Sequence, residues 1–220
     1  MLFTATLLWT CALVFANPAD DLVDDVLLGI KPKIILAGLE PAFLDRFQIQ
    51  INSTWLPKFV ADFKNSSVSG LSLLRRKEPC EFKNSTYARA YCVLTTCDLE
   101  ASLRASVKGD RLSRSLHDIV VNVTFVLPKI GVAMEGDHGR QTRLLGTFID
   151  DVIPLVAVEG QLDLNKNRKK EFLRSLQTQV RIRLNDILWN RYGRVFRDEL
   201  QRLNSTLDGS RQTSEARDES

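Results

Sequence analysis

Residues 172–203 have the sequence FLRSLQTQVRIRLNDILWNRYGRVFRDELQRL. Apolar residues recur in this stretch at steps of three and four, which places them on one face of an α-helix. They are Leu173, Leu176, Val180, Leu184, Ile187, Leu188, Tyr192, Val195, Phe196, Leu200 and Leu203. An unbroken helix from residue 167 would be about 55 Å long at about 1.5 Å per residue, longer than a compact domain of this size. We therefore expect either a bend at Gly193 or an elongated molecule in which a sheet wraps along the helix.

The centre of the chain alternates apolar and polar residues, as strands with one buried face do. Residues 99–108 (LEASLRASVK) alternate without a break, and residues 119–126 repeat the period. The apolar faces are formed by Leu99, Ala101, Leu103, Ala105 and Val107 in the first stretch and by Val121, Val123 and Phe125 in the second. Further strands are expected over 47–51, 59–75, 87–96, 129–135 and 143–149. Successive strands without intervening helices indicate an antiparallel meander.

The region before these strands has helical spacing. Aspartates at 20, 21, 24 and 25 surround apolar positions from Leu22 to Ile30, and acidic side chains are favoured in the first turns of a helix. Pro32 and Pro41 are expected to limit this helix, because proline lacks the amide donor that a helix interior needs. Residues 42–44 are interpreted as a short turn, and Asp150-Asp151 as a solvated loop.

The chain starts with an apolar run, residues 2–15, followed by the small-residue site Val14-Phe15-Ala16. A membrane span needs roughly 20 residues, so we interpret 1–16 as a cleaved signal peptide, with a retained anchor as the alternative. We expect a secreted, extracellular protein with one domain over 17–204 and a disordered polar tail over 205–220.

A secreted protein can be glycosylated at Asn-X-Ser/Thr sites, because glycans are transferred to them only on the secretory route. The sequence contains five such sites. They are at Asn52, Asn65, Asn84, Asn122 and Asn204. The mature chain would keep three cysteines. Cys80 and Cys92 lie symmetrically about a turn signal at residues 84–86, so a hairpin would bring them within bridging reach. We predict this disulfide and a free, buried Cys97, with a Cys92–Cys97 bridge as the alternative.

The sequence lacks the motifs that are typical of catalytic and metal-binding sites. The two histidines, His117 and His138, lie in polar stretches, and no catalytic, metal-ligand or nucleotide-binding motif occurs. We therefore expect neither an enzyme nor a bound metal or cofactor. The net charge of +3 includes several cations on the C-terminal helix, among them Arg181, Arg183, Arg191 and Arg194. We interpret them as a solvated helix face that makes only weak, salt-sensitive contact with anionic membranes, and we expect no nucleic-acid binding.

Four short motifs are DFKNSSVSGLS at 62–72, VKGD at 107–110, LNDILWN at 184–190 and VFRDEL at 195–200. They resemble motifs of the takeout and juvenile-hormone-binding proteins of arthropods. The order of elements is most similar to the mite group seven allergens. No cysteine pair lies between Asn17 and Pro79, where takeout-type proteins usually have one, which favours the allergen-like branch.

The resemblance implies an α+β tubular lipid-binding fold of the half-barrel type, as in bactericidal permeability-increasing protein. A strongly curved antiparallel sheet would wrap around the long C-terminal helix, with a shorter N-terminal helix. The expected partner is a hydrophobic small molecule or lipid held in an apolar groove or tunnel. Its wall would combine the eight strand residues above with Leu176, Val180, Leu184 and Ile187.

Two other interpretations are compatible with the same sequence features. A lipocalin-like protein would have a closed barrel of eight shorter strands and a much shorter C-terminal helix. An interaction or innate-immune protein would instead use its surface to bind bacterial envelope lipids or a receptor, and its apolar strand faces would be ordinary core.

Overall fold

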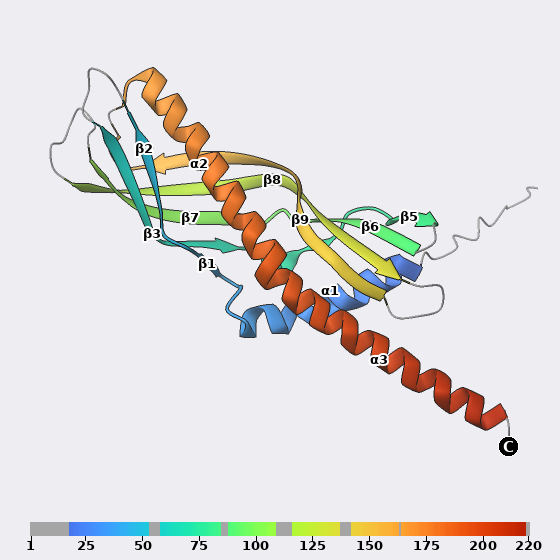
Figure 1. The fold of residues 1–220 in the computed structure, drawn as a ribbon. Coiled ribbons are helices and arrows are strands. Elements are labelled where there is room, and N and C mark those ends of the chain that lie inside the picture. Colours follow the sequence, from blue (N-terminus) through green and yellow to red (C-terminus); the bar gives the residue numbers. More distant parts are fainter. Residues whose placement is uncertain are drawn as a thin grey trace, which may run out of the picture.

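The computed structural model describes residues 18–52, 58–84, 88–108, 116–136, 142–162 and 164–218, which form a curved antiparallel sheet along a long helix (Figure 1). The helical elements are α1 (Pro18–Leu36), the 3-10 turn η1 (Leu71–Leu73), α2 (Lys166–Asp186), the π turn η2 (Ile187–Tyr192) and α3 (Gly193–Asp218). The strands are β1 (Ala42–Leu44), β2 (Phe47–Ile51), β3 (Phe59–Ser69), β4 (Arg75–Arg76), β5 (Glu81–Asn84), β6 (Ala88–Thr95), β7 (Glu100–Lys108), β8 (His117–Gly136) and β9 (Thr142–Glu159). The predicted signal peptide lies outside the described residues.

Strand β8 is the axis of the sheet. Along one edge it pairs first with β7 and then with β6, and along its other edge it pairs with β9. Strand β3 continues the first half and carries β1 and β2 on its far side, while β6 carries β4 and β5 in the second half. The long β8–β9 hairpin therefore runs through both halves of the molecule, as Figure 1 shows.

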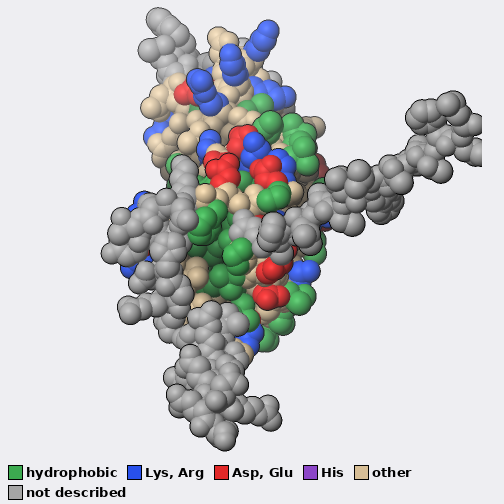
Figure 2. Space-filling model, turned by 90° about the vertical axis from the view of Figure 1, so that its right-hand side faces the viewer, with side chains coloured by type: hydrophobic (Ala, Val, Ile, Leu, Met, Phe, Trp, Pro, Cys, Tyr) green, Lys and Arg blue, Asp and Glu red, His purple; other side chains and the backbone are tan. Residues whose placement is uncertain are grey.

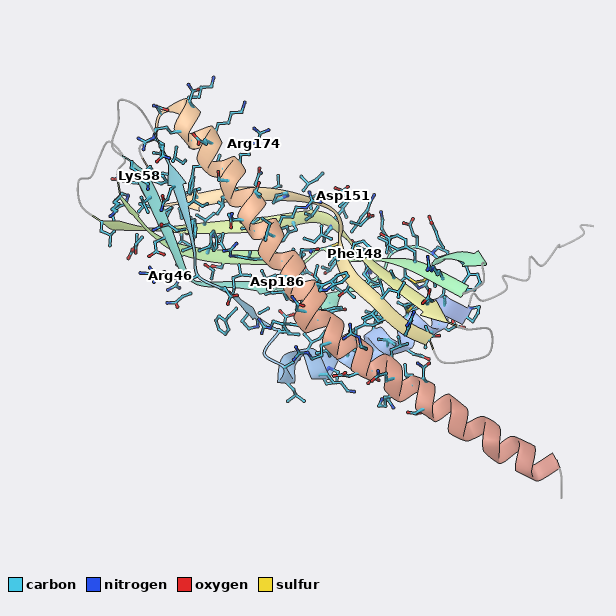
Figure 3. All side chains as sticks on the ribbon, in the orientation of Figure 1. Arg46, Lys58, Phe148, Asp151, Arg174 and Asp186 are labelled. Atoms are coloured by element: carbon cyan, nitrogen blue, oxygen red, sulfur yellow. A yellow bond between two sulfur atoms is a disulfide. The ribbon has the colours of Figure 1, made fainter. Side chains whose placement is uncertain are left out.

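The two halves meet at a bend in this hairpin. Leu127 has a φ of 43°, and the β8–β9 register shifts between Val126 and Lys129. An irregularity of this kind bends a strand and increases its twist. The expected strands at 119–126 and 129–135 are thus two limbs of one strand. Asp151 lies at the bend of β9 rather than in the predicted loop, because the strand continues past it to Glu159 (Figure 3).

The C-terminal helix is continuous and the molecule is elongated, so the second of the two expected alternatives holds and the helix is not broken at Gly193. α2 passes through the π turn η2 into α3, which projects beyond the sheet (Figure 1). The helical backbone reaches Asp218, through most of the segment predicted as a disordered tail. Extending a helix that is already packed is easier than starting one, which accounts for this difference.

α1 packs against α3, and its N-terminal aspartates attach it to β4. The Arg76 guanidinium bonds Asp24 at 2.7 Å and lies 3.2 Å from a carboxylate oxygen of Asp20. Contrary to the prediction, α1 continues past Pro32 to Leu36. Because proline has no amide hydrogen, Pro32 cannot donate the helical hydrogen bond to the Leu28 carbonyl. Leu28 is 69% exposed, so it lies on the face of the helix that water can reach.

The predicted hairpin disulfide is confirmed. Glu81 pairs with Tyr91 in the β5–β6 register, which places Cys80 opposite Cys92, and the two are bridged. Cys97 is free as expected, but it is exposed rather than buried, because it lies in the bend that follows β6.

Residues 42–44 form a strand and not the expected turn. Ala42 and Leu44 are buried while Phe43 is 66% exposed, which is the period of a strand, and β1 pairs with β3. In the part of the chain that the structure describes, no helix is long and apolar enough to cross a membrane.

The sheet is not closed into a lipocalin-like barrel. Its two outer edges, β1–β2 on one side and β9 on the other, are separated by the C-terminal helix, as the contacts below establish. The fold class predicted from the sequence is therefore confirmed: an α+β protein with a curved antiparallel sheet, a long C-terminal helix and a shorter N-terminal helix.

Candidate functional site

All twelve residues of the predicted ligand wall lie between the sheet and the helix. The register pairs Ala101 with Val123 and Leu103 with Val121, so the two predicted strand faces are one surface. We call the twelve the apolar layer: Leu99, Ala101, Leu103, Ala105, Val107, Val121, Val123, Phe125, Leu176, Val180, Leu184 and Ile187. Each is at most 3% exposed, so in this structure they form a shared, water-shielded hydrophobic interior.

A group of phenylalanines extends the apolar layer toward the start of α2. The rings of Phe47 and Phe63 stack at 4.5 Å, and Phe172 contacts Phe59 edge-on at 5.5 Å and Phe63 at 6.5 Å. Such geometries add attraction beyond the burial of area. The rings attach α2 to β2 and β3 at this end.

Two arginines cover these rings. The guanidinium of Arg183 lies 4.3 Å from the centre of the Phe47 ring, and that of Arg168 lies 5.9 Å from the centre of the Phe59 ring. Burial lowers the pKa of Arg183 from its ordinary value, although nearby Asp45 opposes this. Both cations therefore act as packing groups rather than as members of a solvated face.

Arginines also bind the helix to the β1–β2 edge. Arg191 donates to the carbonyl oxygens of Phe43 at 3.2 Å and of Gly38 at 3.1 Å, and Arg183 donates to that of Asp45 at 3.4 Å. Two of the four arginines that were predicted to face solvent are thus used in holding the fold. Arg181 and Arg194 are exposed, as expected.

Amide side chains bind the same helix to the other edge of the sheet. Asn204 donates to the Thr142 carbonyl at 2.7 Å, and Asn185 accepts from the Ile149 amide at 2.9 Å. Gln177 donates to the Pro154 carbonyl at 3.2 Å. An edge strand exposes unpaired backbone groups, and these side chains satisfy several of them. The helix therefore bridges both edges and encloses the apolar layer.

Glycines let the helix approach β9 closely near the π turn. A Cβ on Gly193 would lie 2.9 Å from the Thr147 hydroxyl, and one on Gly146 would lie 2.4 Å from the Trp189 ring. The Thr147 hydroxyl donates to the Leu188 carbonyl, which also accepts from the Gly193 amide. Trp189 itself is half exposed and covers Gly146.

The apolar layer approaches the surface along residues 152–158 of β9. Val152, Val156 and Val158 point inward but are only partly buried, and they pack against the core together with Leu162 and Leu173. We call these five residues the seam. These residues were not among the predicted wall residues, although residues 151–159 (DVIPLVAVE) alternate as strands do. No strand was predicted there, because Asp150-Asp151 was interpreted as a loop and proline is unusual inside a strand.

A hollow on the outer face of the sheet is lined by both charged and apolar side chains. It has a volume of about 370 Å³ and is lined by Asp62, Lys64, Asn65, Arg104, Ala105, Ser106, Asp118, Ile119 and Val120. Arg46 bonds Asp62 there and lowers the pKa of that carboxyl. Its charged side chains do not suit a hydrocarbon chain, and Ala105 is the residue that it shares with the predicted wall.

The sequons differ in their access to water. Asn52 and Asn65 are exposed, and the side chain of Asn84 lies outside the described part of the structure. Asn122 is half-buried and donates to Glu159 at 2.7 Å. Asn204 is buried, and its amide nitrogen is the atom that holds the β9 edge.

Charge is arranged unevenly over the surface. Lysine and arginine side chains gather at the end of the molecule where α2 begins, at the top of Figure 2. The first turn of α2 contains no acidic residue, and Arg174 lies near this end while Asp186 lies where α2 meets η2 (Figure 3). Cations at a helix N-terminus add to its positive dipole end.

An ion pair fastens α1 to α3. Glu199 is 1% exposed, bonds Lys33 and accepts from Arg202 at 2.6 Å. Arg202 first, and then Lys33, lower the pKa of Glu199 to about 2 against the opposing effect of burial. Within the described residues, no group of three or more His, Cys, Asp or Glu side chains lies together as a metal site would require.

No protein-family model and no curated protein matches the chain. Among solved structures, the lipopolysaccharide binding protein is similar at 12% identity and a TM-score of 0.43, over 80% of this chain and 38% of that chain. Takeout 1 of Epiphyas postvittana is similar at 13% identity and a TM-score of 0.30, over 83% of this chain and 88% of that one. The chain thus spans well under half of the former protein. At these identities and TM-scores, the similarity does not indicate what this chain binds.

Proposed function

We propose that this is a secreted protein that holds a hydrophobic or lipid-like ligand between the sheet and the C-terminal helix, without catalysis. The observation that carries the proposal is the apolar layer itself, a hydrocarbon surface that two sheet edges and a helix enclose and that nears water at the seam. The small side chains of Ala101 and Ala105 reduce the volume that the wall itself fills.

The seam is the proposed entrance. Its valines are half-buried, and Gln177 crosses it with one hydrogen bond to the Pro154 carbonyl. A single hydrogen bond of this kind contributes about 1 kcal/mol, so local opening is inexpensive. Burying a fatty chain at about 25 cal/mol per Å² supplies several kcal/mol, enough for micromolar binding after the costs of association.

The test begins with the ligand. Native mass spectrometry and solvent extraction of the secreted protein should reveal a co-purifying hydrophobic molecule, and the fluorescent probe phenylnaphthylamine should bind in a displaceable way. A fully occupied, dry core that neither carries a lipid nor takes up the probe would refute the proposal.

Neighbouring residues of β9 provide a matched pair for locating the entrance. Val156 belongs to the seam, whereas Leu155 is 57% exposed on the opposite face of the sheet. Val156→Asp should reduce probe binding strongly because it places a charge in the apolar path, while Leu155→Asp should leave it unchanged. Val156→Phe, which narrows the seam without a charge, should slow uptake and guards against a folding defect in the aspartate variant. Equal binding by all three variants would contradict the proposed entrance.

A second function is favoured by the cations where α2 begins. Lys166, Lys169, Lys170 and Arg174 are exposed at that end, and they would attract anionic headgroups, including those of bacterial envelope lipids. We expect weak binding to anionic vesicles that high salt removes, because exposed charges are screened over roughly 8 Å at physiological ionic strength. Tight binding that persists in high salt would make membrane or envelope contact the main function.

A further inference from the structure

A phenol hydroxyl, that of Tyr192, lies among the hydrocarbon side chains that the C-terminal helix buries. Tyr192 is 0% exposed, and every other fully buried side chain on the helix from Phe172 to Phe196 is a hydrocarbon. Among the residues that the structure describes, none forms a hydrogen bond with the Tyr192 hydroxyl. A buried hydroxyl without a partner is unfavourable and calls for a reason.

One backbone acceptor of the π turn already has two donors. Leu188 lies one turn before Tyr192, and its carbonyl accepts from both the Gly193 amide and the Thr147 hydroxyl. Burial raises the pKa of Tyr192, so the phenol stays protonated and can donate a hydrogen bond to an oxygen.

The π turn sets the direction of this side chain. The buried positions before it, from Phe172 to Leu184, recur every four residues, and this spacing drifts by about 40° per step around an α-helix. A π turn takes in more than four residues, so the drift reverses across η2 and keeps Tyr192 and Phe196 facing inward. Their rings lie 6.5 Å apart. π turns are uncommon and occur often at functional sites.

We propose that the Tyr192 hydroxyl is the hydrogen-bond donor for an oxygen atom of the ligand, and that it selects neutral oxygenated chains, such as ketones and esters, over plain hydrocarbons. This rests on the proposed function, since it places the ligand in the apolar layer. A carboxylate fits less well, because it would be buried without a cation: the guanidiniums of Arg168 and Arg183 lie over the rings of Phe59 and Phe47.

The test compares Tyr192→Phe with the wild-type protein. A long-chain methyl ketone and the alkane of equal carbon number, both delivered from cyclodextrin, compete against bound phenylnaphthylamine. The variant should bind the ketone about tenfold more weakly, the loss expected for one hydrogen bond, and the alkane equally well. Its melting temperature should equal or exceed that of the wild type, because the hydroxyl has no partner to lose.

Tyr91→Phe is the matched control. Tyr91 is only partly buried, its ring stacks on Phe148 at 6.2 Å, and it interacts with Asp150. This variant should change neither affinity. Unchanged ketone binding by Tyr192→Phe, or a lower melting temperature, would overturn the inference while leaving the proposed function intact. If the wild type binds neither competitor, the proposed function fails and the inference fails with it.

Discussion

Replacing Glu199 with glutamine tests how much the fold depends on the α1–α3 ion pair. The carboxylate is buried against Gly29, where an added Cβ would lie only 2.1 Å from its Oε1 atom. Its pKa falls from 4.5 to about 2, which corresponds to about 3 kcal/mol of stabilisation of the charged form. Because the side chains of Lys33 and Arg202 are 41% and 56% exposed, we reduce this to about 2 kcal/mol at pH 7.

The pH dependence gives the sign of the effect. The folded pKa is lower than the unfolded one, so the contribution is fully present above pH 4.5 and is lost as the pH falls toward 2. Urea unfolding of wild type and Glu199→Gln, measured in steps from pH 7 to pH 2.5, should show two stability curves that converge on acidification. Asp198→Asn, which removes an exposed charge one residue away, should run parallel to the wild type. A glutamine variant as stable as the wild type at pH 7, or a gap that is as wide at pH 2.5 as at pH 7, would refute the reasoning.

Three further predictions concern the helix, the disulfide and the glycans. Gly193→Ala should lower the free energy of unfolding by about 1–3 kcal/mol in urea titrations, because its Cβ would lie 2.9 Å from a hydroxyl oxygen of β9; an unchanged midpoint would contradict this packing. Replacing Cys80 and Cys92 together with serine should cost about 3 kcal/mol in the same assay, since the bridge closes a loop with a sequence separation of 12. In secreted protein, Asn65→Gln should remove one glycan mass, whereas Asn204→Gln should remove none. A glycan on Asn204 would show that its bond to β9 does not form.

Local periodicity was sufficient to predict the main elements. The unbroken alternation of 99–108 predicted both β7 and its buried face, and steps of three and four predicted the long helix. The symmetric placement of Cys80 and Cys92 predicted their bridge, because a hairpin fixes which residues lie opposite each other. In each case, the signal lay within a few residues of the feature.

Features that depend on distant contacts could not be predicted in this way. Arg191 and the Phe43 carbonyl are 148 residues apart, and nothing near either residue identifies the other. The π turn was hidden because a spacing of four fits both helix types. Tyr192 was recognised as one member of an apolar stripe, whereas its isolated hydroxyl became evident only when its neighbours were known.

The helix that bridges the two sheet edges has a consequence for biogenesis. Ribosomes make the strands first, so β9 and the β1–β2 edge have no helix to cover them until residues 166–218 have emerged. Unpaired edges readily associate with other chains, and pairings so distant in sequence form slowly. The nascent protein thus exposes these edges until residues 166–218 are translated. A stop codon or frameshift before residue 166 would release an aggregation-prone product rather than a smaller working domain.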